Sequence, residues 1–531
     1  MTNRLSVRLL FELRDRLDGL KPNLSTGLLI LLLITVSFFV NLGGWPLFDV
    51  DEGAFSAATK HLVDSGNYVT PYLYGEPRFD KPILIYWLQG ISTSVFGFSE
   101  FALRLPSALS LSLWGVALFY FLLQTTNIKV SIFALLILTT NVACIGVSRF
   151  ASADGLLNLF IALSFFDMYR YWEAKHKRFI YRVFLWIALG VLTKGPIAIL
   201  VPLASGFVFF FLQKDLKLFL KAVFDPIGWL VLLLLATPWY AAILLDQGQA
   251  FIDGFLLKHN IGRFAETLEG HGGNIFYYLP VIFLLLIPFS GLFVPLFSRF
   301  SFKTMSSLDQ YCYVTFGFVF IFFSLSSTQL PHYLLYGFTP LIILLAQQQE
   351  SFKSKFLIML PTFFACGLFL CLPEIASMAS EQVKAKDQQM MLASLKDEID
   401  SIYWFSLATL LCLLAWISSR WVQIEHCFYL TAIAQSFFLV LVFIPTIAQV
   451  AQSHVKEAAQ FANTRDQEVV MWKAHIPSFS AYSVRPVERR TPELEDLVLT
   501  RIQHLDSLPD TRVIFSKKGL VLAELVEPSP D

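Results

Sequence analysis

Charged residues are scarce in this chain of 531 residues, since Asp, Glu, Lys and Arg make up 15% of it against 56% hydrophobic residues. The 40 basic and 40 acidic residues cancel, so no charge bias indicates a nucleic-acid partner. A mean hydropathy of +0.61 and 53 phenylalanines exclude an ordinary soluble globule. The composition predicts an α-helical protein that crosses a lipid bilayer many times.

Motifs typical of other protein classes are also missing. No two of the six cysteines form a CxxC pair, which argues against a zinc cage and a disulfide framework. The chain has no glycine-rich phosphate loop, so a nucleotide-linked substrate is not indicated. The cysteines lie in or beside apolar segments, where we expect them to be small packing residues: Cys144, Cys312, Cys366, Cys371, Cys412 and Cys427.

Long apolar runs dominate the chain. A run of about 18 apolar residues is long enough to cross the hydrocarbon core of a bilayer, and thirteen candidate spans can be counted. No signal-peptide cleavage pattern precedes the first of them, so it is expected to stay in the mature protein. The predicted spans lie near 24–48, 106–123, 129–147, 155–172, 179–194, 195–213, 226–245, 276–298, 309–327, 331–347, 355–374, 402–419 and 427–450.

Basic connectors predict how these spans are oriented. Lysines and arginines gather at 175–182 and 214–221, and short basic loops favour the cytoplasmic side. With a cytoplasmic N-terminus, both connectors lie on that side. The loops 49–106 and 246–275 and the tail after residue 450 then share the opposite face, where we expect the chemistry.

The tail 451–531 differs in character from the predicted membrane domain 1–450. EVVMW indicates a strand, Pro477 a turn, and 492–505 a polar helix. A final hairpin is centred on Lys518-Gly519. We expect a small extracytoplasmic α/β domain over the membrane face that stabilises the protein or contacts a partner.

The loop 49–106 holds an unusual number of ionisable side chains for a chain so rich in hydrocarbon. Such groups are costly to desolvate beside a bilayer, so a dense cluster of both signs indicates a functional site. We expect this loop to form the active site. Its charged residues include Asp49, Asp51, Glu52, Asp80, Lys81, Glu100 and Arg104.

Asp51 and Asp154 are the candidate catalytic acids. Asp51 follows the first span and Asp154 begins the fourth, so both lie at a membrane boundary on the same predicted face. A carboxylate in that setting is suited to accept a proton from a hydroxyl. Each could instead cap the helix that follows it. Because two acids lie on separate connections at the same face, we favour a catalytic role over two unrelated helix caps.

Three cations on the same face indicate an anion site. Lys81 precedes an apolar interfacial stretch, Lys194 is followed by Gly-Pro between two spans, and Arg263 lies in the 246–275 loop. Such cations can pair with a phosphate at headgroup depth. The alternative is that they are ordinary snorkelling side chains at span ends.

A divalent metal is a further option. His259 and His271 flank Arg263 and could ligate a metal together with Asp80, but no HxxxH spacing is present. Hydrogen bonding or packing explains these histidines equally well. No other cofactor is indicated.

Several motifs resemble a known family. The pattern DVDEGAFSAATKHLV…GEPRFDKPILIYWLQG…FGFSEFALRLP is similar to the first extracytoplasmic loop of the bacterial aminoarabinose transferases, lipid A-modifying enzymes related to the protein O-mannosyltransferases. Shorter pieces follow in the matching order to about residue 350: LTKGPIAILVP, PWY, HNIGRF, GHGGNIFYYLPV and LPHYLLYGFTP.

The resemblance implies a GT-C glycosyltransferase fold with about 13 transmembrane helices, in a bacterial inner membrane. It implies transfer of a sugar, with inversion, from a polyprenyl-phosphate such as undecaprenyl phosphate to lipid A, another glycan, a protein or a lipid. Asp51 and Asp154 match the family's two acids, Lys81 and Arg263 its phosphate contacts, and Asp80 an acid linked to metal binding. Lys194 is a further candidate for binding the donor phosphate, and other site candidates are Glu52, Arg104, His332 and Tyr333.

Two other classes stay open. A transporter of polyprenyl-linked lipids would also need many spans and interfacial cations, but internal repeats or broken helices near the midplane would be expected. A scaffold without catalysis would leave the acids and cations of one face unexplained.

Gln329 departs from the family pattern, because many relatives have a lysine at this position.

Overall fold

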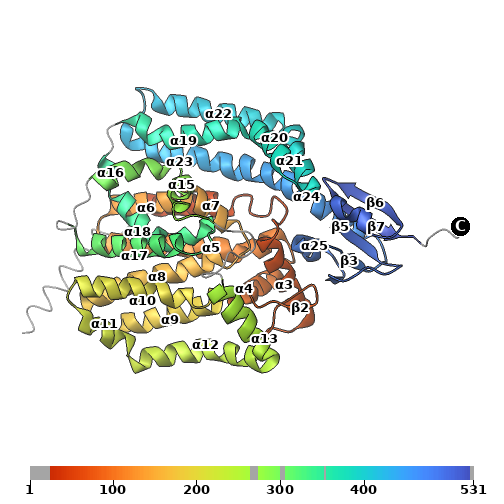
Figure 1. The fold of residues 1–531 in the computed structure, drawn as a ribbon. Helices are drawn as coiled ribbons and strands as arrows, with labels where there is room; N and C mark the ends of the chain where they lie inside the picture. The colour runs from red at the N-terminus through yellow and green to blue at the C-terminus, as the bar shows by residue number, and fades with distance from the viewer. Residues whose placement is uncertain (1–23, 263–272, 299–304, 352–353, 527–531) are drawn as a thin grey trace, which may run out of the picture.

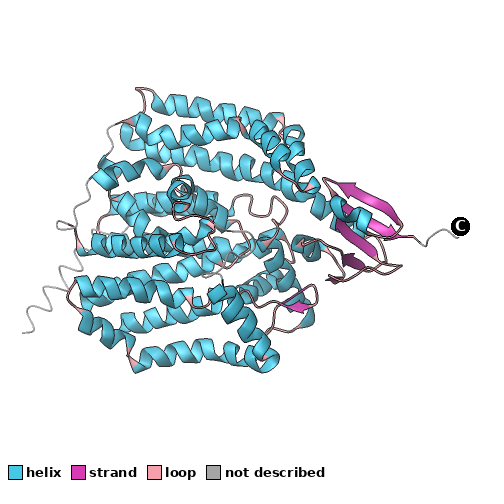
Figure 2. Cartoon of the chain, in the orientation of Figure 1, coloured by secondary structure: helices cyan, strands magenta, loops and turns pink. Residues whose placement is uncertain are grey.

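The computed structural model describes residues 24–262, 273–298, 305–351 and 354–526. Its long helices lie side by side in one bundle, and the C-terminal strands form a small sheet beyond one end of that bundle (Figure 1). Apart from this sheet and one short hairpin, the regular structure of the described chain is helical (Figure 2). The predicted architecture, a helical bundle followed by a small α/β unit, is confirmed.

Most of the bundle helices lie in the predicted apolar segments, whereas α11, α13 and α21 lie in predicted connectors. Polar side chains begin several of them: Ser99 accepts from the N–H of Ala102 before α5, and Asn127 from that of Val130 before α6. Such caps satisfy donors that have no partner within the helix. In chain order the bundle helices are α2 Leu24–Ile34, α5 Glu100–Thr125, α6 Ile128–Thr140, α7 Val142–Ser148, α8 Asp154–Ala174, α9 Lys177–Lys194, α10 Ile197–Leu212, α11 Leu216–Val223, α12 Pro226–Gln247, α13 Gln249–Phe251, α15 Tyr278–Leu285, α16 Phe293–Ser298, α17 Ser307–Ser324, α18 Phe338–Ala346, α19 Lys355–Leu370, α20 Leu372–Gln382, α21 Lys386–Glu398, α22 Ser401–Ser418, α23 Ile424–Phe438 and α24 Ile444–Ala462.

The protein is a multi-pass membrane protein. By length and composition, four helical segments in the described ranges can cross a bilayer: α5, α12, α22 and the continuous stretch Ile424–Ala462. The number rises to seven if each of three bent pairs, α6–α7, α15–α16 and α19–α20, counts as one span. The predicted count of thirteen spans stays a prediction.

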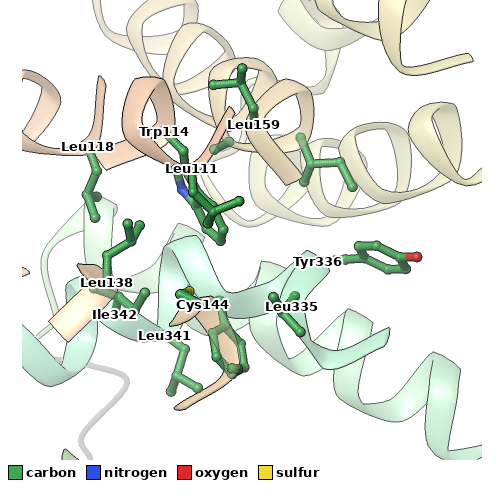
Figure 3. Close-up of a cluster of buried hydrophobic side chains, with 14 of the residues drawn as sticks. Leu111, Trp114, Leu118, Leu138, Cys144, Leu159, Leu335, Tyr336, Leu341 and Ile342 are labelled. Atoms are coloured by element: carbon green, nitrogen blue, oxygen red, sulfur yellow. The ribbon is translucent and has the colours of Figure 1, made fainter. Parts of the chain in front are cut away.

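Large apolar side chains fill the bundle where α5, α6, α8 and α18 meet (Figure 3). Trp114 of α5 is fully buried, and its Nε1 donates to Thr339 Oγ1 of α18 at 2.9 Å. A buried indole N–H needs such a partner. Because α18 is tied to α5 in this way, the turn Pro331–Gly337 that leads into it is held beside α8.

The C-terminal sheet has five strands in the order β4-β3-β5-β7-β6. The first three are parallel, and β7 pairs antiparallel with both β5 and β6. The predicted hairpin at Lys518-Gly519 is confirmed, since it joins β6 and β7. The elements are β3 Val469–Met471, α25 Pro477–Tyr482, β4 Val487–Glu488, β5 Leu497–Arg501, β6 Thr511–Lys517 and β7 Leu520–Leu525.

Two predictions for this tail were wrong. The stretch 492–505 is not one helix, because it contains the central strand β5, whose residues Leu497, Val498 and Leu499 are buried in succession between two neighbouring strands. A continuous apolar run of this kind is typical of a strand covered on both faces. Only the end of the stretch, 502–505, is helical, as part of the short 3₁₀ helix η7 Ile502–Ser507. Pro477 begins the short helix α25 instead of a simple turn, a position that proline favours.

The first loop folds into two helices and a small hairpin at the end of the bundle that carries the sheet (Figure 1). The elements are α3 Asp51–Ser65, β1 Tyr72–Leu73, β2 Glu76–Pro77 and α4 Leu84–Phe96. The predicted helix after Asp51 is confirmed, and Gly66 ends it with a φ of +69°. Asp51 does not cap α3, because the residue before the helix is Val50 and no side-chain cap is formed.

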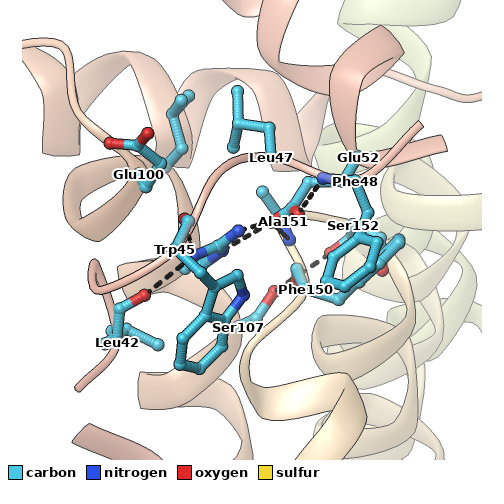
Figure 4. Close-up of polar contacts among 12 residues, drawn as sticks. Leu42, Trp45, Leu47, Phe48, Glu52, Glu100, Ser107, Phe150, Ala151 and Ser152 are labelled. Atoms are coloured by element: carbon cyan, nitrogen blue, oxygen red, sulfur yellow. Dashed lines mark hydrogen bonds and ion pairs between the residues drawn. The ribbon is translucent and has the colours of Figure 1, made fainter. Parts of the chain in front are cut away.

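A buried ion pair fixes the start of α3. Arg104 of α5 donates to both carboxylate oxygens of Glu52, at 2.7 and 3.0 Å, and neither side chain is exposed. Glu52 also accepts backbone N–H groups of Phe48 and Ala151 at 2.8 and 3.0 Å (Figure 4). The remaining guanidinium donors bond the carbonyls of Leu42, Trp45 and Pro46.

We expect Arg104→Ala to destabilise the fold by about 3 to 5 kcal/mol, because Glu52 would keep a buried charge without its partner. Thermal unfolding of the purified full chain in detergent measures the effect. The matched control is Lys129→Ala, whose partner Glu350 lies at 3.4 Å with both side chains 75% exposed. Such an exposed pair contributes about 1 kcal/mol or less. Equal unfolding temperatures for the two variants would contradict the prediction.

Candidate functional site

A cavity of about 490 Å³ opens where the first loop meets the bundle. Two cations, Lys81 and Lys194, lie in its lining. Much of the remaining wall is apolar, formed by Ile197, Leu200, Leu256, Leu257, Phe322 and Phe323. The polar lining is completed by Asp80, His259, Asn260, Ser326, Tyr333 and Tyr336. The cavity therefore combines a cationic part with a surface suited to hydrocarbon.

Lys194, at the end of α9, pairs with the second candidate acid. Its Nζ lies 2.5 Å from Asp154 Oδ1 at the start of α8. Ser152 Oγ donates to the other oxygen at 3.1 Å, and His332 Nε2 lies 3.7 Å from Oδ1. Asp154 does not cap α8, because the residue before the helix is Ala153 and no side-chain cap forms. Both carboxylate oxygens of Asp154 are thus engaged.

Aromatic rings complete the surroundings of Lys194. Its Nζ lies 5.6 Å from the ring centroids of both Tyr333 and Tyr336, a range in which a cation is attracted to a ring face. The structure therefore brings together four residues from three predicted segments, namely Asp154, Lys194, His332 and Tyr333.

Asp80 is held by a cation that sequence reasoning missed. Arg78 Nε and Nη2 donate to its two oxygens at 2.5 and 2.8 Å, and Lys81 Nζ lies 3.5 Å away. Burial alone would raise the pKa of Asp80, but the charges of Arg78 and Lys81 outweigh it and hold the pKa well below its usual range. Arg78 and Asp80 are two positions apart in a loop, and this spacing could have predicted the pair.

The described residues do not fit a divalent metal. Both oxygens of Asp80 are taken by Arg78, and no group of three or more potential ligands comes together in the described ranges. Of the predicted metal residues, His259 lines the cavity, whereas His271 lies outside the described part of the chain. Arg263, a predicted phosphate contact, also lies outside it.

Asp51 differs from the other acids of the site. Its side chain is exposed at the start of α3. It lies within electrostatic range of Arg78, Tyr86 and His332, which places it near the cationic part of the cavity. Glu52 and Arg104, in contrast, are fully buried in their own pair and do not line the cavity.

Asp49 faces the C-terminal domain. Its Oδ1 accepts the backbone N–H of Ser478 at 2.7 Å, and its Oδ2 accepts Ser478 Oγ–H at 2.5 Å. Burial raises the pKa of Asp49 to about 7, although the bonds from Ser478 and the charge of Arg501 favour the ionised form. Glu52 opposes ionisation as well. Asp49 and Ser478 are 429 positions apart in the sequence, so no local sequence pattern could have predicted their contact.

The fold is similar to that of a solved membrane enzyme. The crystal structure of ArnT from Cupriavidus metallidurans bound to undecaprenyl phosphate matches with a TM-score of 0.76 and 16% identity, over 94% of this chain and 98% of that one. ArnT in the apo state gives a TM-score of 0.75. The likeness shows that this chain has the GT-C fold predicted from its first-loop pattern.

The sequence relatives are more specific. A family described as dolichyl-phosphate-mannose-protein mannosyltransferase matches residues 80–241. The undecaprenyl phosphate-alpha-4-amino-4-deoxy-L-arabinose arabinosyl transferase of Yersinia enterocolitica is 28% identical over 337 residues, 62% of this chain and 60% of that protein. An uncharacterized protein of Aquifex aeolicus is 28% identical over 330 residues, 62% of this chain and 64% of that protein.

These matches span less than two thirds of either relative's length. Together with the shared fold, they confirm the resemblance to the aminoarabinose transferase-like glycosyltransferases.

The raised pKa of Asp49 predicts that the chain loses stability as the pH rises from about 4 to about 7. An aspartate in an unfolded chain releases its proton near pH 3.9, whereas Asp49 in the folded chain keeps its proton to about 7. Between these values the folded state binds the extra proton, so stability falls with rising pH. Asp49→Asn should remove this contribution.

Melting temperatures in detergent from pH 5 to pH 8 measure this effect. Relative to Asp49→Asn, wild type should lose a few degrees across that range, on the order of 1 °C per kcal/mol for a chain of this length. Asp506→Asn, which removes an exposed carboxylate, is the control and should track wild type. A pH-independent difference between wild type and Asp49→Asn would show that Asp49 does not titrate in this range.

Proposed function

We propose that the protein is an integral membrane glycosyltransferase that moves a sugar from a polyprenyl-phosphate donor to an extracytoplasmic acceptor. The observation that carries this proposal is the cavity, whose lining joins Lys81 and Lys194 to an apolar wall. A phosphate attached to a long hydrocarbon chain needs both surfaces at once. The similarity to an undecaprenyl phosphate-dependent arabinosyl transferase supports the same donor class.

The two lysines are assigned to the donor phosphate. As the bond between the sugar and the phosphate breaks, the phosphate oxygen keeps the electron pair and gains negative charge. Ammonium groups already in place beside that oxygen stabilise the charge with little rearrangement. Arg263, outside the described residues, is proposed as a further phosphate contact from the family resemblance.

Asp51 is assigned to the acceptor. Within the described part of the chain its carboxylate has no ion pair or hydrogen bond, so it is available to accept a proton. The acceptor oxygen attacks the anomeric carbon from the face opposite the phosphate, its proton passes to Asp51, and the configuration at that carbon inverts. Tyr333 lines the cavity, and His332 lies within electrostatic range of Asp51.

Asp154 is assigned a different role. Its oxygens are occupied by Lys194 and Ser152, and a carboxylate paired with a cation is a weak proton acceptor. It therefore holds the Lys194 ammonium in place. The two acids that look alike in the sequence are separated in function by their partners.

The proposed orientation follows the basic connectors. The face that carries the first loop and the sheet is extracytoplasmic, in a bacterial inner membrane, with a membrane domain of residues 1–450 and an outer domain of 451–531. The acceptor is a hydroxyl or phosphate of lipid A, another glycan, a protein or a lipid. None of the residues that line the cavity belongs to the bent pairs α6–α7, α15–α16 and α19–α20, which gives the transporter alternative no support.

The test is sugar transfer from a panel of polyprenyl-phosphate sugars to membrane acceptors, with the purified full chain in proteoliposomes. Asp51→Asn should lower transfer by about 10²-fold or more, because the proton acceptor is lost. Lys81→Ala should lower it by about 10²-fold through lost charge stabilisation. The donor that is consumed identifies the sugar.

The matched control is Asp64→Asn, which removes a carboxylate from the opposite end of α3. Asp64 is 65% exposed, and its one ion pair, with Lys60, is 4.0 Å long. It should keep wild-type transfer. If labelled lipid crosses the bilayer without donor consumption, equally in wild type and Asp51→Asn, the protein is a transporter and the enzyme proposal is wrong.

A further inference from the structure

The C-terminal domain rests directly on α3 through the short helix α25. Ser478, near the start of α25, binds both oxygens of Asp49 with its backbone N–H and its hydroxyl. Asp49 lies two positions before Asp51. The contact therefore joins the outer domain to the turn that carries the proposed proton acceptor.

The two backbones approach so closely that one position must be glycine. A Cβ atom added to Gly53 would lie 2.4 Å from Ser478 N, 2.8 Å from Ser478 Cα and 2.5 Å from Asp49 Oδ1. Atoms at these distances would overlap sterically, so a side chain at this position would push α25 away from α3. The first turn of α3 is thus shaped to receive α25.

Other polar contacts surround this point. Tyr482 Oη accepts the N–H of Leu47 at 2.6 Å and donates to Glu100 Oε1 at 2.9 Å. Lys456 of α24 lies 2.5 Å from the same carboxylate oxygen. Lys60 of α3 donates to the carbonyl of Ser483. These bonds seat α25 on the first loop at several points.

A small apolar core lies beneath them. Ala481 of α25 packs with Leu47, Ala57, Leu103 and Ala151, all of which are buried. Leu47 precedes α3, Ala57 lies within it and Leu103 belongs to α5. The outer domain therefore shares a packed interface with the elements that position the candidate site.

Contacts from two different parts of the protein hold the start of α3. Glu52 is bound by Arg104 from the membrane bundle, and Asp49 is bound by Ser478 from the outer domain. Asp51 lies between them in sequence and is exposed. If either contact were lost, the turn that carries Asp51 would be less constrained.

We propose that Ser478 is a positioning residue of the transfer site, which acts through Asp49 to hold the first turn of α3 and so to orient Asp51. The inference rests on the proposed function, and it makes the C-terminal domain a working part of the site. It assigns the domain a role beyond stabilising the bundle.

The test compares Ser478→Ala with Ser480→Ala in the full chain. Ser480 lies in the same helix, and its hydroxyl has no hydrogen-bond partner in the described structure. Ser478→Ala should lower kcat for sugar transfer by about 10-fold or more, since small misplacements of reacting groups are costly. KM for the donor should change by less than about twofold, because the cavity cations are untouched. Ser480→Ala should match wild type.

Ser478→Thr is the rescue variant, because it keeps the hydroxyl, and it should recover most of the lost kcat. Amide hydrogen exchange gives a readout that needs no activity. In Ser478→Ala, exchange in the first turns of α3, residues 52–57, should speed up by about 10-fold as local opening becomes easier, while exchange in the bundle helices stays unchanged. Gly53→Ala should produce the same local pattern.

Three results would overturn the inference. One is wild-type kcat and wild-type exchange in Ser478→Ala. Another is a loss of kcat accompanied by an equal loss of donor binding and of folded protein, which would mark a purely structural contact. The third is failure of Ser478→Thr to recover activity. If wild type transfers no sugar at all, the proposed function fails, whereas the exchange comparison still decides whether Ser478 holds α3.

Discussion

The buried pair of Glu52 and Arg104 is the interaction on which the candidate site depends. Two charges removed from water are tolerated only when their hydrogen-bonding groups are satisfied, and here all five guanidinium donors are used: two bind Glu52 and three bind backbone carbonyls. The pair thereby ties α5, the start of α3 and the connection before α8 into one unit. Both candidate acids, Asp51 and Asp154, are adjacent to parts of that unit.

The same rule of paired charge explains how the acids differ. Asp80 is neutralised by Arg78, and Asp154 by Lys194, each in a partly buried setting where an isolated carboxylate would be costly. Asp51 is exposed, so water satisfies it and no cation is required. In the proposed mechanism, proton transfer therefore falls to the acid that is not paired with a cation.

Much of the fold could be predicted from the sequence, because its signals are local. Apolar length located the helices, and alternation around Lys518-Gly519 located the hairpin. The strand β5 was missed because LVLTR, with its polar flanks, resembles a helical segment until its neighbours β3 and β7 cover it. Residues 492–505 show that a short apolar run, although typical of a buried strand, cannot be distinguished from a helical segment by its periodicity alone.

The candidate site could be predicted as a set of residues but not as a set of pairs. Asp154 and Lys194 are 40 positions apart and meet because α8 and α9 pack closely, with the start of one beside the end of the other. This pairing is the basis of the role proposed for Asp154, which is to hold the Lys194 cation, and no residue pattern indicates the pairing. The contact of the outer domain was likewise not predictable from a residue pattern. Its sequence indicated only a small appended domain, and the close approach of Ser478 to Gly53 shows that this domain reaches the turn bearing Asp51.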